Sequence, residues 1–250
     1  DNWGQIKKIP NPGYPGETIN TSQYGFYSVD IYGDYIVGGC RSQKITDNGT
    51  LYSNAGAAYI FRKDEGGSEN WGLIHSLKCR DITSAHGGVY FGSNVSISDD
   101  VLVISAKGAT GSGAAYVYIR TDTTWNYSER LRSDDKIYGG GGNTSYNGVV
   151  VETDGKKILS YTQNGEVGDA YANSGIVFLY VKNAQNKFIE KTAFGATGST
   201  NSWHFGRTLA MNNDTICIGA YADNTVITNG GSVSIFKQHE GGINNWGLVK

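Results

Sequence analysis

The sequence offers few residues whose types and spacing suit catalysis or metal binding. The four histidines, His75, His86, His204 and His239, do not lie near a cysteine or carboxylate at metal-ligand spacing. No nucleophile elbow or zinc-protease motif is present. The glycine run 139–142 is followed by Asn-Thr-Ser rather than the Lys-Ser pair of a phosphate loop. We therefore expect no enzyme activity, no metal and no cofactor.

Composition narrows the remaining classes of protein. The chain has 250 residues, 36 glycines, 17 tyrosines and a net charge of −2, with basic residues scattered along it. The absence of a basic cluster argues against a nucleic-acid partner. No apolar run approaches the roughly 18–20 residues of a membrane span, so we expect no membrane insertion. Abundant Tyr, Val, Ile and Thr with many glycines indicate strands joined by tight turns.

The sequence also aligns to itself four times. Each copy begins with a strand, a tight polar turn and a second strand, and the copies recur at intervals of 55 to 66 residues. We align them on four apolar anchors: Val29, Val95, Val150 and Leu209. A glycine then opens a third strand at Gly56, Gly113, Gly175 and Gly231, and an aromatic residue marks a fourth at Trp71, Trp125, Phe188 and Trp246.

Four short strands repeated at this period predict an all-β propeller of four-stranded antiparallel blades. The blades are expected at about 23–79, 90–132, 144–192 and 203–250, within a single propeller region. Such a sheet cannot bury both of its faces alone, so its neighbours must stack beside it. A β-sandwich or β-solenoid built from the same hairpins is the alternative.

Two cysteines fall at the same end of the first blade. Cys40 ends its second strand and Cys79 ends its fourth, and we expect a disulfide between them if the loop residues close the gap. Cys217 lies inside a strand and is interpreted as a small buried hydrophobic residue.

Six glycosylation sequons begin at Asn20, Asn48, Asn94, Asn126, Asn143 and Asn213, of which Asn94 lies in a strand and is the least suited to glycosylation. Sequons and disulfide together favour an extracellular or cell-surface protein.

The repeat resembles the FG-GAP repeat, which builds the propeller head of integrin α chains and occurs in microbial surface proteins. The resemblance rests on Phe91–Ser105, on the Gly113–Tyr118 strand and on Trp125, and it is weakest over 143–192. It implies a closed ring of about seven blades. Integrin-type repeats carry a calcium loop with three spaced carboxylates between the first two strands; here that connection is only a tight turn, so the sequence resembles a calcium-free variant.

The loops after the second and fourth strands are long and varied, and they meet on one face of a propeller. Recognition usually resides on such loops. The candidate ligand-binding residues there are Arg41, Asp47, Tyr52, Tyr138, Tyr161, Asp169, Tyr171, Trp203, Tyr221 and Asp223.

The opening Asn2-Trp3-Gly4 repeats the fourth-strand sequences at Asn70-Trp71-Gly72 and Asn245-Trp246-Gly247. We therefore expect residues 1–10 to form the outer strand of a preceding blade, supplied by further sequence or by another copy.

These features favour a noncovalent adhesion or assembly module of the cell surface, whose partners are other protein chains or further blades. A lectin that binds glycans through the loop face is the second hypothesis, and an enzyme is the third.

Overall fold

The computed structural model describes residues 4–17, 25–82, 88–109, 113–131, 150–163, 175–196, 204–228, 230–243 and 245–250. Every named element within these ranges is a β-strand. No helix among them is long and apolar enough to cross a membrane.

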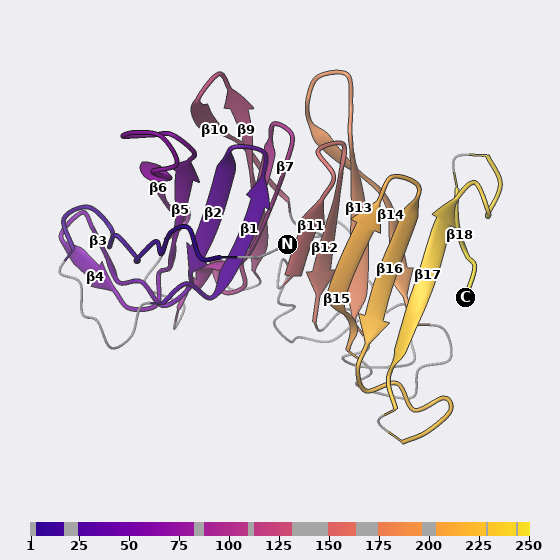
Figure 1. The fold of residues 1–250 in the computed structure, drawn as a ribbon. Coiled ribbons are helices and arrows are strands. Elements are labelled where there is room, and N and C mark those ends of the chain that lie inside the picture. Colours follow the sequence, from indigo (N-terminus) through magenta and orange to yellow (C-terminus); the bar gives the residue numbers. More distant parts are fainter. Residues whose placement is uncertain are drawn as a thin grey trace.

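The strands form four antiparallel sheets of four strands each, which we call blades one to four (Figure 1). Blade one contains β1 (Ser28–Tyr32), β2 (Tyr35–Cys40), β5 (Ala57–Arg62) and β6 (Gly72–Lys78). Blade two contains β7 (Phe91–Ser98), β8 (Val101–Ala106), β9 (Ala114–Thr121) and β10 (Thr124–Leu131). Blade three contains β11 (Val150–Thr153), β12 (Lys157–Thr162), β13 (Ile176–Lys182) and β14 (Phe188–Gly195). Blade four contains β15 (Phe205–Asn212), β16 (Thr215–Ala220), β17 (Ser232–Gln238) and β18 (Trp246–Leu248).

A fifth, two-stranded sheet was not expected from the sequence. It pairs β3 (Ile45–Asp47) with β4 (Thr50–Tyr52) inside the loop that leaves β2. Asn48 and Gly49 both have positive φ at its tip, as a tight hairpin turn requires.

The all-β fold of four-stranded antiparallel blades is confirmed, but the third anchor is wrong by one residue. Val29, Val95 and Leu209 each lie three positions before the last residue of the first strand that pairs across the hairpin, and they face Gly38, Ile104 and Ile218. In blade three the last such contact is made by Asp154, whose N–H donates to Lys157 O. This place therefore belongs to Val151, which faces Ser160 and is buried, whereas Val150 is only partly buried. Three consecutive valines hide the register, because each fits a strand equally well.

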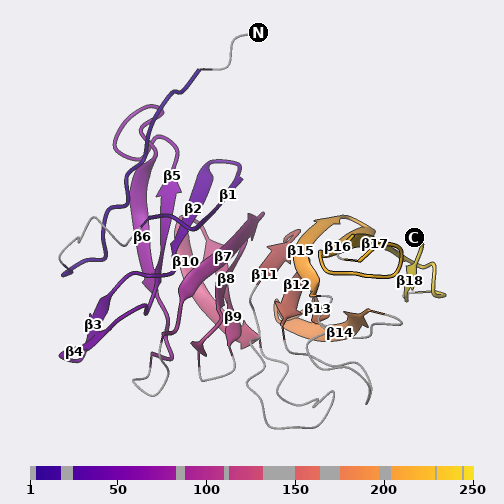
Figure 2. The ribbon, with the colours of Figure 1, turned by 90° about the horizontal axis from the view of Figure 1, so that it is seen from below.

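The blades stand side by side around a common line, as the view in Figure 2 shows. Their first strands, β1, β7, β11 and β15, contact one another in that order on the inner side. We call the side of each blade that packs on the next one its following face, and the opposite side its preceding face.

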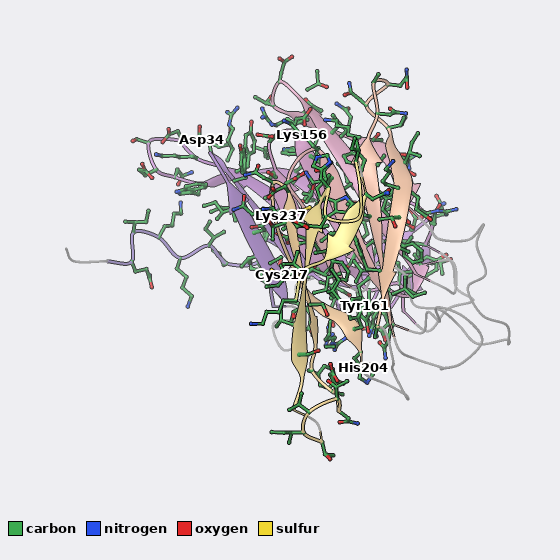
Figure 3. All side chains as sticks on the ribbon, turned by 90° about the vertical axis from the view of Figure 1, so that its right-hand side faces the viewer. Asp34, Lys156, Tyr161, His204, Cys217 and Lys237 are labelled. Atoms are coloured by element: carbon green, nitrogen blue, oxygen red, sulfur yellow. The ribbon has the colours of Figure 1, made fainter. Side chains whose placement is uncertain are left out.

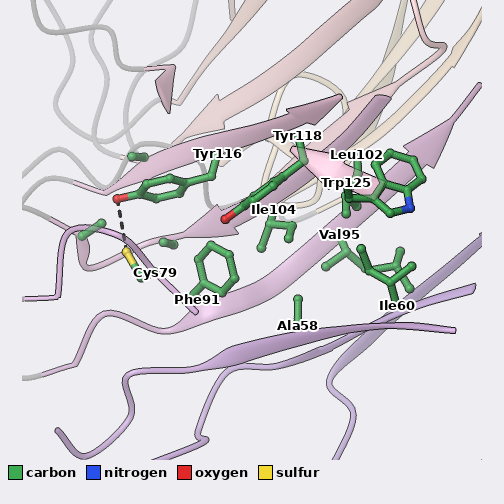
Figure 4. Close-up of a cluster of buried hydrophobic side chains, with 14 of the residues drawn as sticks. Ala58, Ile60, Cys79, Phe91, Val95, Leu102, Ile104, Tyr116, Tyr118 and Trp125 are labelled. Atoms are coloured by element: carbon green, nitrogen blue, oxygen red, sulfur yellow. Dashed lines mark hydrogen bonds between the residues drawn. The ribbon is translucent and has the colours of Figure 1, made fainter. Parts of the chain in front are cut away.

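Apolar cores fill the space between neighbouring blades. Between blades one and two, Ala58 and Ile60 of β5 pack against Val95, Leu102 and Ile104 (Figure 4). Separate clusters join blade two to blade three and blade three to blade four. Because strand side chains alternate, each blade contributes one half of its residues to each neighbouring core.

A Phe-Gly pair locks the junction between blades one and two, and that between blades three and four, at the loop end. Phe91 is fully buried, and its backbone N–H donates to Ala55 O at 3.0 Å, which places it against Gly56 of the preceding blade. A Cβ at Gly56 would overlap the Phe91 backbone, and Gly56 has φ +81°, so only glycine fits here. Phe205 approaches Gly175 in the same way between blades three and four.

The inner strands are also tied by side chains, because neighbouring first strands do not share a hydrogen-bond ladder. Asp30 Oδ2 accepts the Ile97 N–H at 2.8 Å, and one blade further on Ser96 Oγ accepts the Thr153 N–H at 3.1 Å. Asp30 and Ser96 occupy the same place in their blades, so the contact is repeated. It satisfies inner-strand donors that would otherwise lack partners.

Residues 4–10, the described part of the expected outer strand, form no strand within this chain, and their pairing with a blade supplied from elsewhere stays a prediction. Ile9 and Tyr14 instead pack on the preceding face of blade one, against Cys40, Tyr59 and Phe61. Prolines at 10, 12 and 15 remove backbone donors, which disfavours a ladder along this segment. The segment therefore covers part of a sheet face rather than extending a sheet edge.

The expected disulfide is also wrong, because Cys40, Cys79 and Cys217 are free thiols. Cys40 pairs with Ala57, which pairs with Lys78, so Cys79 points to the opposite face of the sheet from Cys40. One strand lies between them, a separation of about 9–10 Å that exceeds disulfide reach. Burial raises the pKa of both thiols to about 11. Cys79 donates to Tyr116 Oη at 3.2 Å, as Figure 4 shows.

The blade lock predicts that Gly56→Ala destabilises the protein much more than Gly33→Ala. Both glycines have positive φ, but Gly33 has open space around its Cα, so its change should cost only about 1 kcal/mol. Gly56→Ala must also displace the Phe91 backbone, and we expect roughly 3 kcal/mol. Urea unfolding followed by circular dichroism measures both. Equal losses for the two variants would show that the Phe-Gly contact does not hold the blades together.

Candidate functional site

Three basic side chains gather at the loop end of the inner strands. Arg41 follows β2, Lys107 follows β8 and Arg207 lies near the start of β15, so they come from blades one, two and four. Within the described residues none of the three forms an ion pair. We call this group, with its aromatic neighbours Tyr27, Tyr90, His204 and Tyr221, the loop-face cluster.

Aromatic rings support the charged groups of this cluster. The Arg41 guanidinium carbon lies 3.7 Å from the Tyr27 ring centroid, and Lys107 Nζ lies 4.6 Å from that of Tyr90. His204 and Tyr221 stack with centroids 4.9 Å apart and planes within 5°. Cation–π contacts of this kind hold a charge in place without neutralising it.

The charges of the cluster act on one another. Burial lowers the pKa of Lys107, and the nearby Arg41 and Arg207 lower it further. Burial and Arg207 likewise lower the pKa of His204. The loop-face cluster is therefore a region of positive potential, whose chemistry is suited to an anionic or polar ligand rather than to a metal ion.

Tyr161 lies beneath this cluster and not on its surface. It was expected to be an exposed loop residue, but it is the fifth residue of β12 and is fully buried. Burial raises its pKa to about 12, and its hydroxyl finds no hydrogen-bond partner within the described chain. Figure 3 shows Tyr161 and His204 toward the same end of the sheets, with Lys156 toward the other.

The other predicted ligand-binding residues do not form one group. Asp47 and Tyr52 lie on the β3–β4 hairpin, where Asp47 pairs with Lys78 Nζ at 2.5 Å. Arg41 and Tyr221 belong to the loop-face cluster. Tyr138, Asp169, Tyr171 and Trp203 lie outside the described residues. Ligand binding by any of them stays a prediction.

Asp223 organises its own loop. It is 7% exposed, and its Oδ1 accepts the Thr225 N–H at 2.8 Å and the Thr225 hydroxyl at 2.7 Å. Burial would raise the pKa of this carboxyl, but hydrogen bonds from Ser232 and Thr225 outweigh burial and lower it. These bonds occupy the carboxylate, so its arrangement is that of a turn residue.

Sequence reasoning missed Lys107, Arg207 and Tyr90. A signal was available, because Lys107 and Tyr221 immediately follow the second strand of their blades, as Arg41 does, while Tyr90 and His204 immediately precede the Phe-Gly pair. Reading these positions across the repeats would have placed them at one end of the inner strands.

The candidate glycan acceptors are accessible where they are described. Asn48, Asn126 and Asn213 are exposed, and Asn20 and Asn143 lie outside the described residues. Asn94 accepts the Val151 N–H at 2.7 Å and so ties blade two to blade three. In the described ranges, no group of three or more His, Cys, Asp and Glu side chains could hold a metal ion.

The family comparison agrees with this geometry. A model of the FG-GAP repeat matches residues 84–118 and 195–236, which overlap the first three strands of blades two and four. The chain contains FG-GAP repeats. Each matched segment holds a Phe-Gly pair, and the first also holds the Gly113-Ala114-Ala115 opening of a third strand. No curated protein matches the chain.

The inner strand of blade three carries a carboxyl group that the sequence did not single out. Glu152 occupies in blade three the place of Asp30 and Ser96, and it accepts from Ser96 Oγ at 3.5 Å. Burial, and then the negative charge of Asp30, raise the pKa of Glu152 to about 7. Glu152 therefore holds its proton under mildly acidic conditions.

This carboxyl predicts a stability that falls as pH rises. The unfolded group titrates near 4.5 and the folded group near 7, so between these values the folded state binds more protons and loses stability with rising pH. Glu152→Gln removes the penalty. Its melting temperature should match the parent near pH 4.5, exceed it increasingly up to about pH 7, and then keep a constant advantage. A difference that is the same at every pH from 4 to 8 would contradict the assignment.

Proposed function

We propose that this FG-GAP domain is a noncovalent assembly module that docks another blade on the following face of blade four. The observation that carries the proposal is Val233, which is 61% exposed. The equivalent residues after the glycine of the third strand are Ala58, Ala115 and Val177, and all three are fully buried by the next blade.

The docking partner is defined by the blade that covers these equivalents. Ala58 packs in one core with Val95 and Ile97, which lie on the preceding face of blade two. The same positions in blade one are Val29 and Ile31, and they are 68% and 58% exposed. The two open surfaces therefore have the chemistry of the two halves of an existing blade junction.

A second copy of this chain can thus supply the partner face. The contact is heterologous, because the following face of one copy meets the preceding face of another. Ile9 and Tyr14 cover the part of that face near Cys40 and leave Val29 and Ile31 open. A further blade with the same preceding face would serve equally.

We place this module outside the cell or at its surface, in adhesion or in a structural assembly. The exposed sequon residues Asn48, Asn126 and Asn213 support this setting, whereas the free cysteines add nothing to it. The module has no catalytic role in this proposal.

Glycan binding at the loop face is the second candidate function. The loop-face cluster favours it, because stacked His204 and Tyr221 and the aromatic-supported Lys107 and Arg41 suit rings and polar groups of a sugar. Binding of glycans that Arg41→Ala and Tyr221→Ala abolish, without any change in self-association, would favour this function over assembly.

Assembly predicts concentration-dependent association that Val233→Arg weakens by at least about tenfold, since it buries an unpaired charge in the contact. Sedimentation velocity over a range of concentrations measures this. Ile243→Arg is the matched control: Ile243 is 86% exposed on blade four but lies in the β17–β18 turn. A chain that stays monomeric at all concentrations, or that responds equally to both variants, would refute the proposal.

A further inference from the structure

A cavity of about 540 Å³ opens between blades three and four at the end opposite the loop-face cluster. Its walls include Lys156, Lys157, Lys182 and Lys191 of blade three, and Gln238 and Trp246 of blade four. Figure 3 shows Lys156 at this end of the molecule. We call it the lysine cavity.

The lysine cavity occupies a wedge-shaped space between two blades, and the equivalent wedge between blades one and two is filled by side chains of the protein itself. Tyr35 begins the second strand of blade one as Lys157 begins that of blade three. Arg120 pairs with Trp125 across β9 and β10 as Gln238 pairs with Trp246 across β17 and β18.

The filling side chains stack on one another. The rings of Tyr35 and Trp125 meet edge to face at 5.7 Å, and the Arg120 guanidinium lies 4.9 Å from the Tyr35 centroid. Trp125 is consequently buried, whereas Trp246 is only partly buried. Lysine in place of Tyr35 and glutamine in place of Arg120 leave the wedge between blades three and four open.

The lysine cavity carries excess positive charge. Lys157 pairs with Asp154 at 2.5 Å and Lys182 pairs with Asp100 at 3.0 Å. Lys156 and Lys191 are exposed, and neither side chain forms an ion pair or hydrogen bond in the described structure. Two ammonium groups therefore remain available to an anion at the rim of a cavity that has an aromatic wall.

We propose that the lysine cavity binds an acidic saccharide. The carboxylate or sulfate of the sugar pairs with Lys156 and Lys191, the apolar face of the sugar ring lies against Trp246, and a hydroxyl meets the Gln238 amide. A concave site with an aromatic wall and a few convergent polar groups is typical of small-ligand pockets, and a charged ligand oxygen strengthens each hydrogen bond. This site is independent of the assembly face and of the loop-face cluster.

The test measures binding of three tetrasaccharides by calorimetry at low salt: a sulfated one from heparin, a carboxylated one from hyaluronan, and neutral chitotetraose. At least one acidic sugar should bind, the neutral one should not, and salt should weaken the binding. Lys156→Gln and Lys191→Gln should each weaken it up to about fivefold. Lys237→Gln is the control, since Lys237 lies on the other face of β17 from Gln238 and should bind like the parent.

A charge-neutral variant separates a true site from general attraction. Lys157→Tyr with Gln238→Arg copies the filling of the first wedge without changing net charge, so the protein should stay folded but lose the sugar. Four results would overturn the proposal: no acidic tetrasaccharide binds, inorganic sulfate binds as tightly as the sugar, Lys237→Gln weakens binding as much as Lys156→Gln, or the folded double variant still binds.

Discussion

The contact between the Phe-Gly pair of one blade and the glycine that opens the third strand of the preceding blade is the constraint on which the first and third blade junctions depend. Phe91 reaches the junction core only because neither Gly56 nor Gly92 carries a side chain there, and Phe205 meets Gly175 in the same way. This approach sets the spacing of neighbouring sheets, so apolar residues of both faces interlock and inner-strand side chains such as Asp30 reach the next backbone.

A blade that is locked to its neighbours in this way always has two apolar faces to cover. Inside the chain each face finds a partner, and at blade one the segment with Ile9 and Tyr14 covers part of the preceding face. At blade four the following face stays open around Val233. The proposed assembly continues the packing of one blade face on the next. The lysine cavity arises where two blades pack with the same backbone arrangement but with side chains that leave the space between them open.

The sequence predicted the parts of this structure that repeat. Strand order, the four four-stranded sheets and the tight turns between first and second strands follow from motifs that recur with the same spacing. It failed where one side chain or one register decides the outcome. Val150 was taken for Val151, Cys40 and Cys79 share an end but not a face, and Tyr161 sits one residue inside a strand. Segments 83–87, 132–149, 164–174 and 197–203 hold several predicted loop residues and lie outside the described structure. The loop-face cluster combines residues from three blades, and only the three-dimensional arrangement brings them together.

Hydrogen exchange, followed by mass spectrometry across protein concentration, tests most directly whether each blade depends on having both faces covered. In dilute protein, the amides of β8 and β12, covered on both sides, should exchange only through global unfolding, while those of β16 and β17 should exchange at least about tenfold faster. The gap should narrow as concentration rises and the open face of blade four becomes covered. Equal protection of the second and third strands of all four blades in dilute protein would contradict the account.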